Sequence, residues 1–191
     1  MNTKSIFAAL AFTAASFAMA PASAVVITTN PNAAINDFRT VDSTLNVTSH
    51  YIIQDLNVLL TSLTHTWDED LVISILAPGG TTVLLSDRRG GSSNNYTNTI
   101  FDDAAATAIS VGAAPFTGSF RPEELLSVFN GADAFGVWTL RVSDVAGADT
   151  GRLHTWGLDI TPAKVPEPAT TALLGLGLLG FAASRRKAAK R

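Results

Sequence analysis

Acidic residues gather at points where the sequence predicts turns, and their carboxylates could bind a metal ion. Between residues 25 and 164, seven of the fifteen acidic side chains form three groups: Asp68-Glu69-Asp70, Asp102-Asp103, and Asp144 with Asp149. Hard oxygen ligands on loops suit calcium, although this spacing matches no EF-hand. We therefore predict calcium as a cofactor, with solvated turn aspartates as the alternative. The predicted ligands are Asp70, Asp102, Asp103, Asp144 and Asp149.

Residues for nucleophilic or zinc chemistry are present, but they form no recognisable set. A serine protease needs a nucleophile, a base and an orienting acid in contact. The sequence has His50, His65, His154 and many serines, but it has no Gly-x-Ser-x-Gly elbow and no zinc-spaced histidine pair. The absence of cysteine excludes disulfides and thiolate chemistry. We therefore predict no catalytic residue and no enzymatic activity.

Three aromatic side chains are candidates for stacking on a ligand such as a sugar ring. They are Trp67, Tyr96 and Trp156. Trp156 lies on a strand with a core-like pattern, where a tryptophan more often packs inside the fold. The sequence leaves the ligand unidentified.

Two strands near the C-terminus have to position these groups. Residues 138–143 and 156–160 both alternate apolar and polar side chains, a period typical of half-buried strands. We expect them to form a hairpin around the loop 144–151, with Trp138 and Trp156 pointing into one core.

Further short strands are predicted at 45–49, 52–63, 71–76 and 81–85, and an edge strand at 25–29. Pro78-Gly79-Gly80 is a turn between the strands 71–76 and 81–85. We expect a long polar loop at 87–99, and either one helical turn or a loop at 123–129. Short strands with glycine turns and no long helical period indicate an all-β sandwich.

Both ends of the chain resemble targeting segments. Residues 1–24 form a signal peptide for signal peptidase, with Ala22 and Ala24 at the cleavage site. Residues 163–191 contain Val165-Pro166-Glu167-Pro168, an apolar stretch at 169–184 and a basic end with Arg185 and Arg186. The apolar stretch is short for a transmembrane helix but could enter a membrane, with its basic end on the cytoplasmic side.

The charge of the central region excludes one class of partner. Residues 25–164 hold fifteen acidic and seven basic side chains, a net charge of −8. A domain that binds nucleic acid normally carries a basic patch, so we predict no nucleic-acid partner.

The central region resembles the P domain, or P/Homo B domain, of proprotein convertases. Several ordered motifs carry the resemblance: His65-Thr66-Trp67, Phe101-Asp102-Asp103, Phe129-Asn130-Gly131, Val142-Ser143-Asp144 and Trp156-Gly157-Leu158. It implies a jelly-roll-like antiparallel β-sandwich of eight strands, of the galactose-binding-like type, over residues 46–162. Residues 25–45 would then be an N-terminal extension or edge strand. The resemblance also implies a structural hydrogen-bonding role for His65.

In that family the domain follows and stabilises a subtilisin-like catalytic domain, and no block of this sequence resembles the catalytic motifs. Phe135 and Val137 replace the asparagine and threonine expected in the family pattern Ala-Asn-Gly-Thr-Trp. These two changes affect the expected detail of that turn.

The C-terminal segment resembles the PEP-CTERM sorting signal of exported bacterial proteins. That resemblance implies recognition by an exosortase-type membrane protease, transient anchoring in the inner membrane, and a final place in the outer envelope or outside the cell.

Two classes of function stay open. The first is a non-catalytic surface module that binds or stabilises a polysaccharide or surface-protein ligand, and a glycan-binding jelly roll is one form of it. The second is an enzyme or part of one, either an accessory P domain of a serine endopeptidase system or a protein with a hydrolase activity that the sequence does not reveal.

Overall fold

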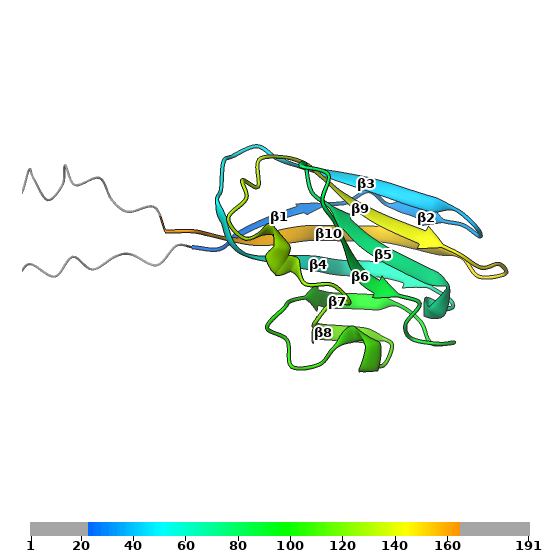
Figure 1. The fold of residues 1–191 in the computed structure, drawn as a ribbon. Coiled ribbons are helices and arrows are strands. Elements are labelled where there is room, and N and C mark those ends of the chain that lie inside the picture. The colour runs from blue at the N-terminus through cyan, green and yellow to red at the C-terminus, as the bar shows by residue number, and fades with distance from the viewer. Residues whose placement is uncertain (1–22, 165–191) are drawn as a thin grey trace, which may run out of the picture.

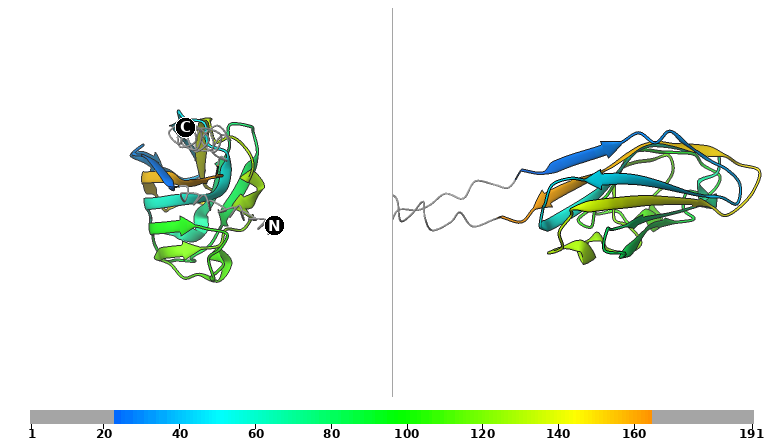
Figure 2. Two further views of the ribbon diagram at one scale, coloured as in Figure 1. Left: turned by 90° about the vertical axis from the view of Figure 1, so that its left-hand side faces the viewer. Right: turned by 90° about the horizontal axis from the view of Figure 1, so that it is seen from above.

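The computed structural model describes residues 23–164, which form a sandwich of two β-sheets (Figures 1 and 2). The larger sheet has six strands in the order β1-β10-β4-β7-β8, with β2 also paired to β10. The smaller sheet has four strands in the order β3-β9-β5-β6. The all-β sandwich expected from the sequence is confirmed.

The described residues contain ten strands and three short 3₁₀ turns. They are β1 (Val25–Thr29), β2 (Ala33–Ile35), β3 (Thr40–Val47), β4 (Ile53–His65), η1 (Asp68–Asp70), β5 (Leu71–Leu76), β6 (Thr82–Asp87), β7 (Tyr96–Phe101), η2 (Ile109–Val111), β8 (Phe116–Phe120), η3 (Leu126–Phe129), β9 (Gly136–Asp144) and β10 (Gly151–Pro162).

The two tryptophans predicted to point inward are both buried between the sheets. Trp138 on β9 is 1% exposed and Trp156 on β10 is fully buried. Each indole N–H has a partner, because Trp138 Nε1 donates to the carbonyl oxygen of Ala134 and Trp156 Nε1 donates to Ser43 Oγ, both at 2.8 Å. The inward register assigned from the alternation is therefore confirmed.

The expected hairpin between the last two strands is wrong. β9 lies between β3 and β5 in the smaller sheet, whereas β10 pairs with β1, β2 and β4 in the larger one. The connection 145–150 therefore crosses from one sheet to the other, a gap of about 10 Å in a sandwich. Each strand finds buried partners on both sides in this way, which a two-stranded hairpin does not provide.

Local predictions between β5 and β9 had mixed outcomes. β5 and β6 form the expected antiparallel hairpin, and Gly80 in its turn has a φ of 86°. The loop expected to extend to residue 99 ends earlier, since β7 begins at Tyr96 and pairs with β4. The turn expected within 123–129 is η3. β7 and β8 are parallel, an exception to the antiparallel pairing of the sandwich.

Residues 25–47 are part of both sheets. β1 is the edge strand of the larger sheet, and β3 pairs with β9 along its whole length. The domain boundary expected at residue 46 therefore falls inside β3.

Several expected segments lie outside the described residues. They are most of the signal peptide 1–24 with Ala22, the apolar stretch 169–184, and the sorting residues Val165, Pro166, Glu167, Pro168, Arg185 and Arg186. Ala24 is described and exposed, just before β1. Between residues 23 and 164, no helix has the length and apolar character needed to cross a membrane.

We predict that Trp138→Ala lowers the free energy of unfolding by about 3–5 kcal/mol, because it leaves a cavity and removes the bond to Ala134. Urea denaturation of residues 23–164 measures the change. The matched control is Val137→Ala, since Val137 is the neighbouring side chain on β9 and points outward. A loss below about 1 kcal/mol for Trp138→Ala would contradict the buried position.

Candidate functional site

Four loops gather at the end of the sandwich opposite to the one where residues 23 and 164 lie (Figure 1). They are residues 36–39, 66–70, 88–95 and 145–150, which we call the distal loops. Backbone bonds join them, since Phe38 N donates to Ala146 O, Val145 N to Asp70 O, and Asp68 N to Ser93 O. The four loops therefore form one connected surface.

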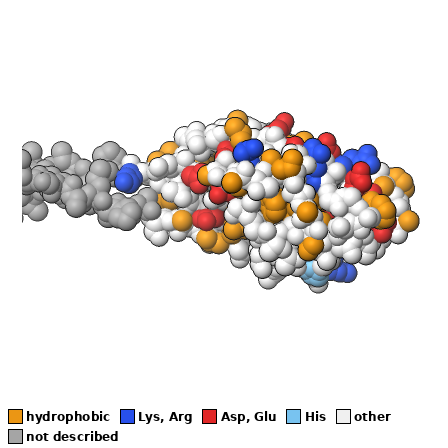
Figure 3. Space-filling model, turned by 90° about the horizontal axis from the view of Figure 1, so that it is seen from below, with side chains coloured by type: hydrophobic (Ala, Val, Ile, Leu, Met, Phe, Trp, Pro, Cys, Tyr) orange, Lys and Arg blue, Asp and Glu red, His pale blue; other side chains and the backbone are white. Residues whose placement is uncertain are grey.

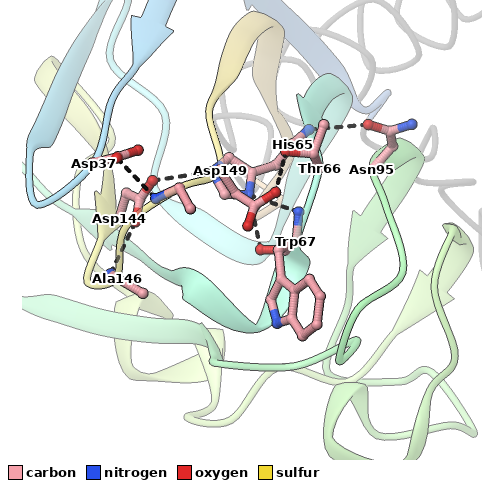
Figure 4. A network of polar contacts seen from close by, with 9 residues as sticks. Asp37, His65, Thr66, Trp67, Asn95, Asp144, Ala146 and Asp149 are labelled. Atoms are coloured by element: carbon pink, nitrogen blue, oxygen red, sulfur yellow. Dashed lines mark hydrogen bonds and ion pairs between the residues drawn. The ribbon is translucent and has the colours of Figure 1, made fainter.

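A buried histidine–aspartate pair holds the base of these loops (Figure 4). His65 ends β4 and Asp144 ends β9, so the pair joins the two sheets. His65 Nε2 lies 3.1 Å from Asp144 Oδ2, and both side chains are fully buried. His65 Nδ1 donates to the carbonyl oxygen of Trp67 at 2.8 Å. The structural hydrogen-bonding role expected for His65 agrees with these contacts.

His65 Nε2 thus faces a carboxylate oxygen, whereas Nδ1 faces both the carbonyl oxygen and, at 3.3 Å, the N–H group of Trp67. The imidazole is thus held between the carboxylate that ends β9 and the backbone of the loop that follows β4. The other oxygen, Asp144 Oδ1, accepts a bond from Ala146 N at 3.0 Å. Asp144 therefore fixes the start of the loop that crosses between the sheets.

Close backbone approach makes this junction possible. Gly151 faces His65 in the pairing of β10 with β4. A Cβ added at Gly151 would lie 2.0 Å from the carbonyl oxygen of Thr64, so only glycine fits there. This requirement explains why a glycine begins β10.

Asp68 is a buried carboxyl that the sequence-based ligand set omitted. Its Oδ1 accepts a bond from Asn95 N at 2.9 Å, whereas its Oδ2 is buried without a partner. Burial raises the pKa of Asp68 to about 7, although the Asn95 bond and the nearby His65 act in the opposite direction. Gly90 covers it, since a Cβ there would lie 2.8 Å from Asp68 Cβ.

The remaining distal carboxyls have separate roles. Asp149 Oδ1 accepts a bond from Thr66 Oγ1 at 2.7 Å (Figure 4). The pKa of Asp70 is raised, first by burial and then by the charge of Asp144. Asp70, Asp144 and Asp149 are thus neighbours, as the calcium hypothesis requires of these three.

The other two predicted ligands lie at the opposite end of the sandwich, after β7. Asp103 accepts bonds from Leu126 N and Ser127 N at 2.9 and 2.8 Å, and Asp102 accepts one from Ala104 N at 2.7 Å. The pKa of Asp55 is raised by burial and by the charges of Asp102, Asp103 and Asp159. The five aspartates do not converge, and within 23–164 no three carboxyl or imidazole groups are placed to share a metal ion.

The exposed aromatic residues differ from those expected. Tyr96 and Trp156 are fully buried, so neither can stack on a ligand from solution. Tyr96 lies 3.0 Å from Ser86 Oγ through its hydroxyl, and burial raises its pKa. Trp67 is 41% exposed, as a stacking role requires.

Phe38, which the sequence analysis did not select, is the most exposed aromatic of the distal loops. It is 72% exposed and its φ is 54°, a conformation rare for a bulky residue. Gly147 makes room for its ring, since a Cβ there would lie 3.0 Å from it. Such local strain concentrates at binding sites. The sequence could not predict this feature, because phenylalanine carries no preference for a positive φ.

The other histidines show no catalytic arrangement. His50 Nδ1 lies 2.6 Å from Asp133 Oδ2 on the surface, and its ring stacks on Phe135. His154 Nε2 lies 3.4 Å from Thr64 Oγ1. In the part of the chain that the structure describes, no serine hydroxyl is bonded to a histidine.

Comparison with known families identifies the domain. The model of the proprotein convertase P-domain matches residues 53–160. The chain belongs to the proprotein convertase P-domain family. The PEP-CTERM protein-sorting motif matches residues 164–187, which implies processing by an exosortase-type system. Both resemblances stated above are confirmed, and no curated protein matches the chain.

Two solved structures are similar to this chain. The serine protease of Aeromonas sobria in complex with its chaperone ORF2 matches with a TM-score of 0.49 and 20% identity, over 75% of this chain and 28% of the protease. The serine protease of Aeromonas sobria matches with a TM-score of 0.47 and 19% identity, over 74% and 27% respectively. This chain spans less than a third of the length of either.

We predict that Asp68 makes stability depend on pH. Its pKa in the fold, about 7, is higher than in the unfolded chain. The contribution of protonated Asp68 to the free energy of unfolding is therefore fully present below about pH 4. It is lost as the pH rises to about 7, by about 1.4 kcal/mol for each pH unit. The Asp68→Asn variant lacks this pH-dependent contribution. The urea midpoint of the variant should therefore exceed that of the original chain at pH 8 and approach it at pH 4. Parallel pH profiles would contradict the shift. Asp149→Asn is the matched control.

Calcium binding remains a prediction. Calcium at millimolar concentration should raise the melting temperature of residues 23–164, and a chelator should lower it again. Because the five predicted ligands lie at two ends of the sandwich, Asp70→Asn/Asp149→Asn tests the distal end and Asp102→Asn/Asp103→Asn tests the other end: the pair that binds calcium should abolish the rise and the other pair should leave it. A melting temperature that calcium leaves unchanged would refute the hypothesis.

Proposed function

We propose that this protein is an exported, non-catalytic binding module of the cell surface or the exopolysaccharide matrix. A signal peptidase removes residues 1–24, and an exosortase-type protease recognises the C-terminal motif. The protein is anchored transiently in the inner membrane and then reaches the outer envelope or the outside of the cell. The distal loops bind the ligand.

The observation that carries the proposal is the separation of the two ends of the domain. The sorting motif begins at residue 164, directly after β10. The distal loops, with the exposed Trp67 and Phe38, lie at the other end. A domain held through its C-terminal segment would therefore present these loops outward.

The chemistry of the distal loops favours a neutral glycan as the ligand. Exposed aromatic rings provide flat apolar surfaces for sugar rings, and a nearby carboxylate such as Asp149 can accept bonds from hydroxyl groups. The net charge of −8 over residues 25–164 disfavours an acidic polysaccharide. The buried His65–Asp144 pair keeps the loops rigid, so little loop ordering opposes binding.

Family membership favours a second candidate, the support of a separate subtilisin-like serine endopeptidase. P domains are the non-catalytic part of proteases, and this chain matches their family model. In that case the chain would stabilise a catalytic domain made as another protein.

We predict that residues 23–164 are retarded in affinity electrophoresis through at least one of three neutral polysaccharides: dextran, cellulose derivative or galactomannan. Trp67→Ala and Phe38→Ala should each weaken retention about tenfold, equivalent to about 1.4 kcal/mol, because each removes a stacking surface.

The matched control is Phe135→Ala, an exposed phenylalanine at the opposite end. If none of the polysaccharides retards the domain, or if all three variants behave alike, the glycan proposal fails. Stabilisation of a subtilisin-like catalytic domain by added residues 23–164 would then favour the second candidate.

A further inference from the structure

Exposed apolar side chains concentrate at the end of the sandwich from which the chain continues toward the sorting motif, which we call the tail end. They are between 48% and 60% exposed, and they lie on β1, before β4, at and just before η3, and at and just before the start of β9: Val26, Ile52, Leu125, Val128, Phe135 and Val137. These six are the majority of the ten large apolar side chains exposed in the described residues. Monomeric soluble domains rarely gather such residues without a partner.

These residues surround the exit of the chain. The two ends of the described chain leave side by side, because Val25 pairs with Ile160 across β1 and β10 (Figures 1 and 2). Ala163 N donates to the carbonyl oxygen of Ile52 at 2.7 Å, so the last residues are bonded to an exposed apolar residue. Ile52 in turn bridges to Asp133, and Phe135 stacks on His50 with ring centroids 4.3 Å apart.

The length of chain beyond this point restricts what can cover the surface. Only four residues, 165–168, separate Lys164 from the apolar run that begins at Ala169. A fully extended chain covers at most about 3.6 Å per residue, so the start of that run lies within about 18 Å of Lys164. Whenever the run is inserted in a bilayer, the tail end must lie close to the lipid headgroups.

We propose that the tail end of the sandwich is seated on the surface of the lipid bilayer while the C-terminal segment is anchored. The proposal rests on the proposed function, because it requires that the segment enter a membrane. Ile52, Val128 and Phe135 enter the boundary between headgroups and acyl chains, where shallow apolar side chains bind.

The charges at this end define how the domain tilts. Asp55, Asp102 and Asp159 lie on or next to strands of the six-stranded sheet, and their mutual repulsion contributes to the raised pKa of Asp55. Phe135 and Val137 belong to the segment that enters β9 of the four-stranded sheet. Figure 3 shows apolar and acidic side chains interspersed at this end. Beside Phe135 lies one carboxylate, Asp133, and it is paired with His50 at 2.6 Å. Acidic groups without such a partner avoid an anionic surface, so the side of the four-stranded sheet lies nearer the lipid.

The absence of cysteine allows a direct test, because single cysteines can be labelled without background. Residues 25–191 carrying Val128→Cys or, as the matched control at the distal loops, Val145→Cys are labelled with a fluorophore. They are reconstituted with vesicles of phosphatidylethanolamine and phosphatidylglycerol that contain brominated lipid. Seating predicts quenching at position 128 that is about twofold or more above that at position 145. Equal quenching at the two positions would overturn it.

Two further measurements separate the outcomes. Flotation of the labelled chain, lost on deletion of residues 165–191, reports insertion of the C-terminal segment. Flotation with equal quenching overturns the seating alone, whereas failure to float overturns both the seating and the anchoring.

The double change Ile52→Ser/Phe135→Ser in the Val128→Cys chain should reduce the quenching to the level at position 145. Near-ultraviolet circular dichroism from the buried Trp138 and Trp156 verifies that each variant is folded. Undiminished quenching in a folded variant would show that these side chains do not contact the lipid.

Discussion

The buried contact between His65 and Asp144 is the constraint on which the distal end of the structure depends. It joins the last residue of β4 to the last residue of β9, and thus one sheet to the other. Removing either partner would leave an uncompensated charge or polar group without access to water, a change that costs about 3–5 kcal/mol in comparable buried pairs. The loops 66–70 and 145–150 both begin at this contact, so their conformations are set together.

The core extends the same principle of cross-sheet contacts. Trp156 on the six-stranded sheet donates to Ser43 on the four-stranded sheet, and Trp138 on the four-stranded sheet donates to Ala134 just before its own strand. Each indole therefore fills the space between the sheets and satisfies its single donor. A chain without cysteine has no disulfides to restrict its loops, so such contacts gain importance. The buried polar groups thereby take the place of disulfides in this exported domain.

The sequence predicted those features that depend on local pattern. Alternation fixed the inward face of β9 and β10, and the Pro-Gly-Gly turn identified the β5–β6 hairpin, since both follow from side-chain period and backbone preference. The strands with which β9 and β10 pair were not predictable, because the same alternation suits both a hairpin and two strands in facing sheets. β7 was partly hidden in a polar loop, because its Thr97 and Asn98 are exposed and only Tyr96, Thr99 and Phe101 are buried.

The candidate site was predicted less well, for reasons specific to its residues. The acidic groups were counted together, yet Asp103 caps backbone groups of η3 at the tail end while Asp149 holds Thr66 at the other. Spacing along the chain carries no information on which end of a sandwich a turn occupies. Asp68 looked like an ordinary turn residue, although its burial depends on the distant Gly90 and Asn95. Phe38 was missed because phenylalanine carries no preference for the positive φ that the backbone adopts there.

The two ends of the domain differ in how their polar and apolar side chains are placed, and this difference suits them to different contacts. At the distal end, the buried side chains of His65 and Asp144 form hydrogen bonds with the backbone of the loops. The exposed rings of Trp67 and Phe38 therefore belong to loops of fixed conformation. At the tail end, carboxylates repel one another on one sheet while apolar side chains remain in contact with solvent. A rigid surface with exposed aromatic rings favours recognition, because ordering costs little. The apolar surface of the tail end lies only a few residues from the C-terminal apolar run. This short connection favours transient contact between that surface and the bilayer in which the run is anchored. Under the two proposals, the tail end is therefore the part of the domain that contacts the membrane, and the distal loops are the part presented to the outside.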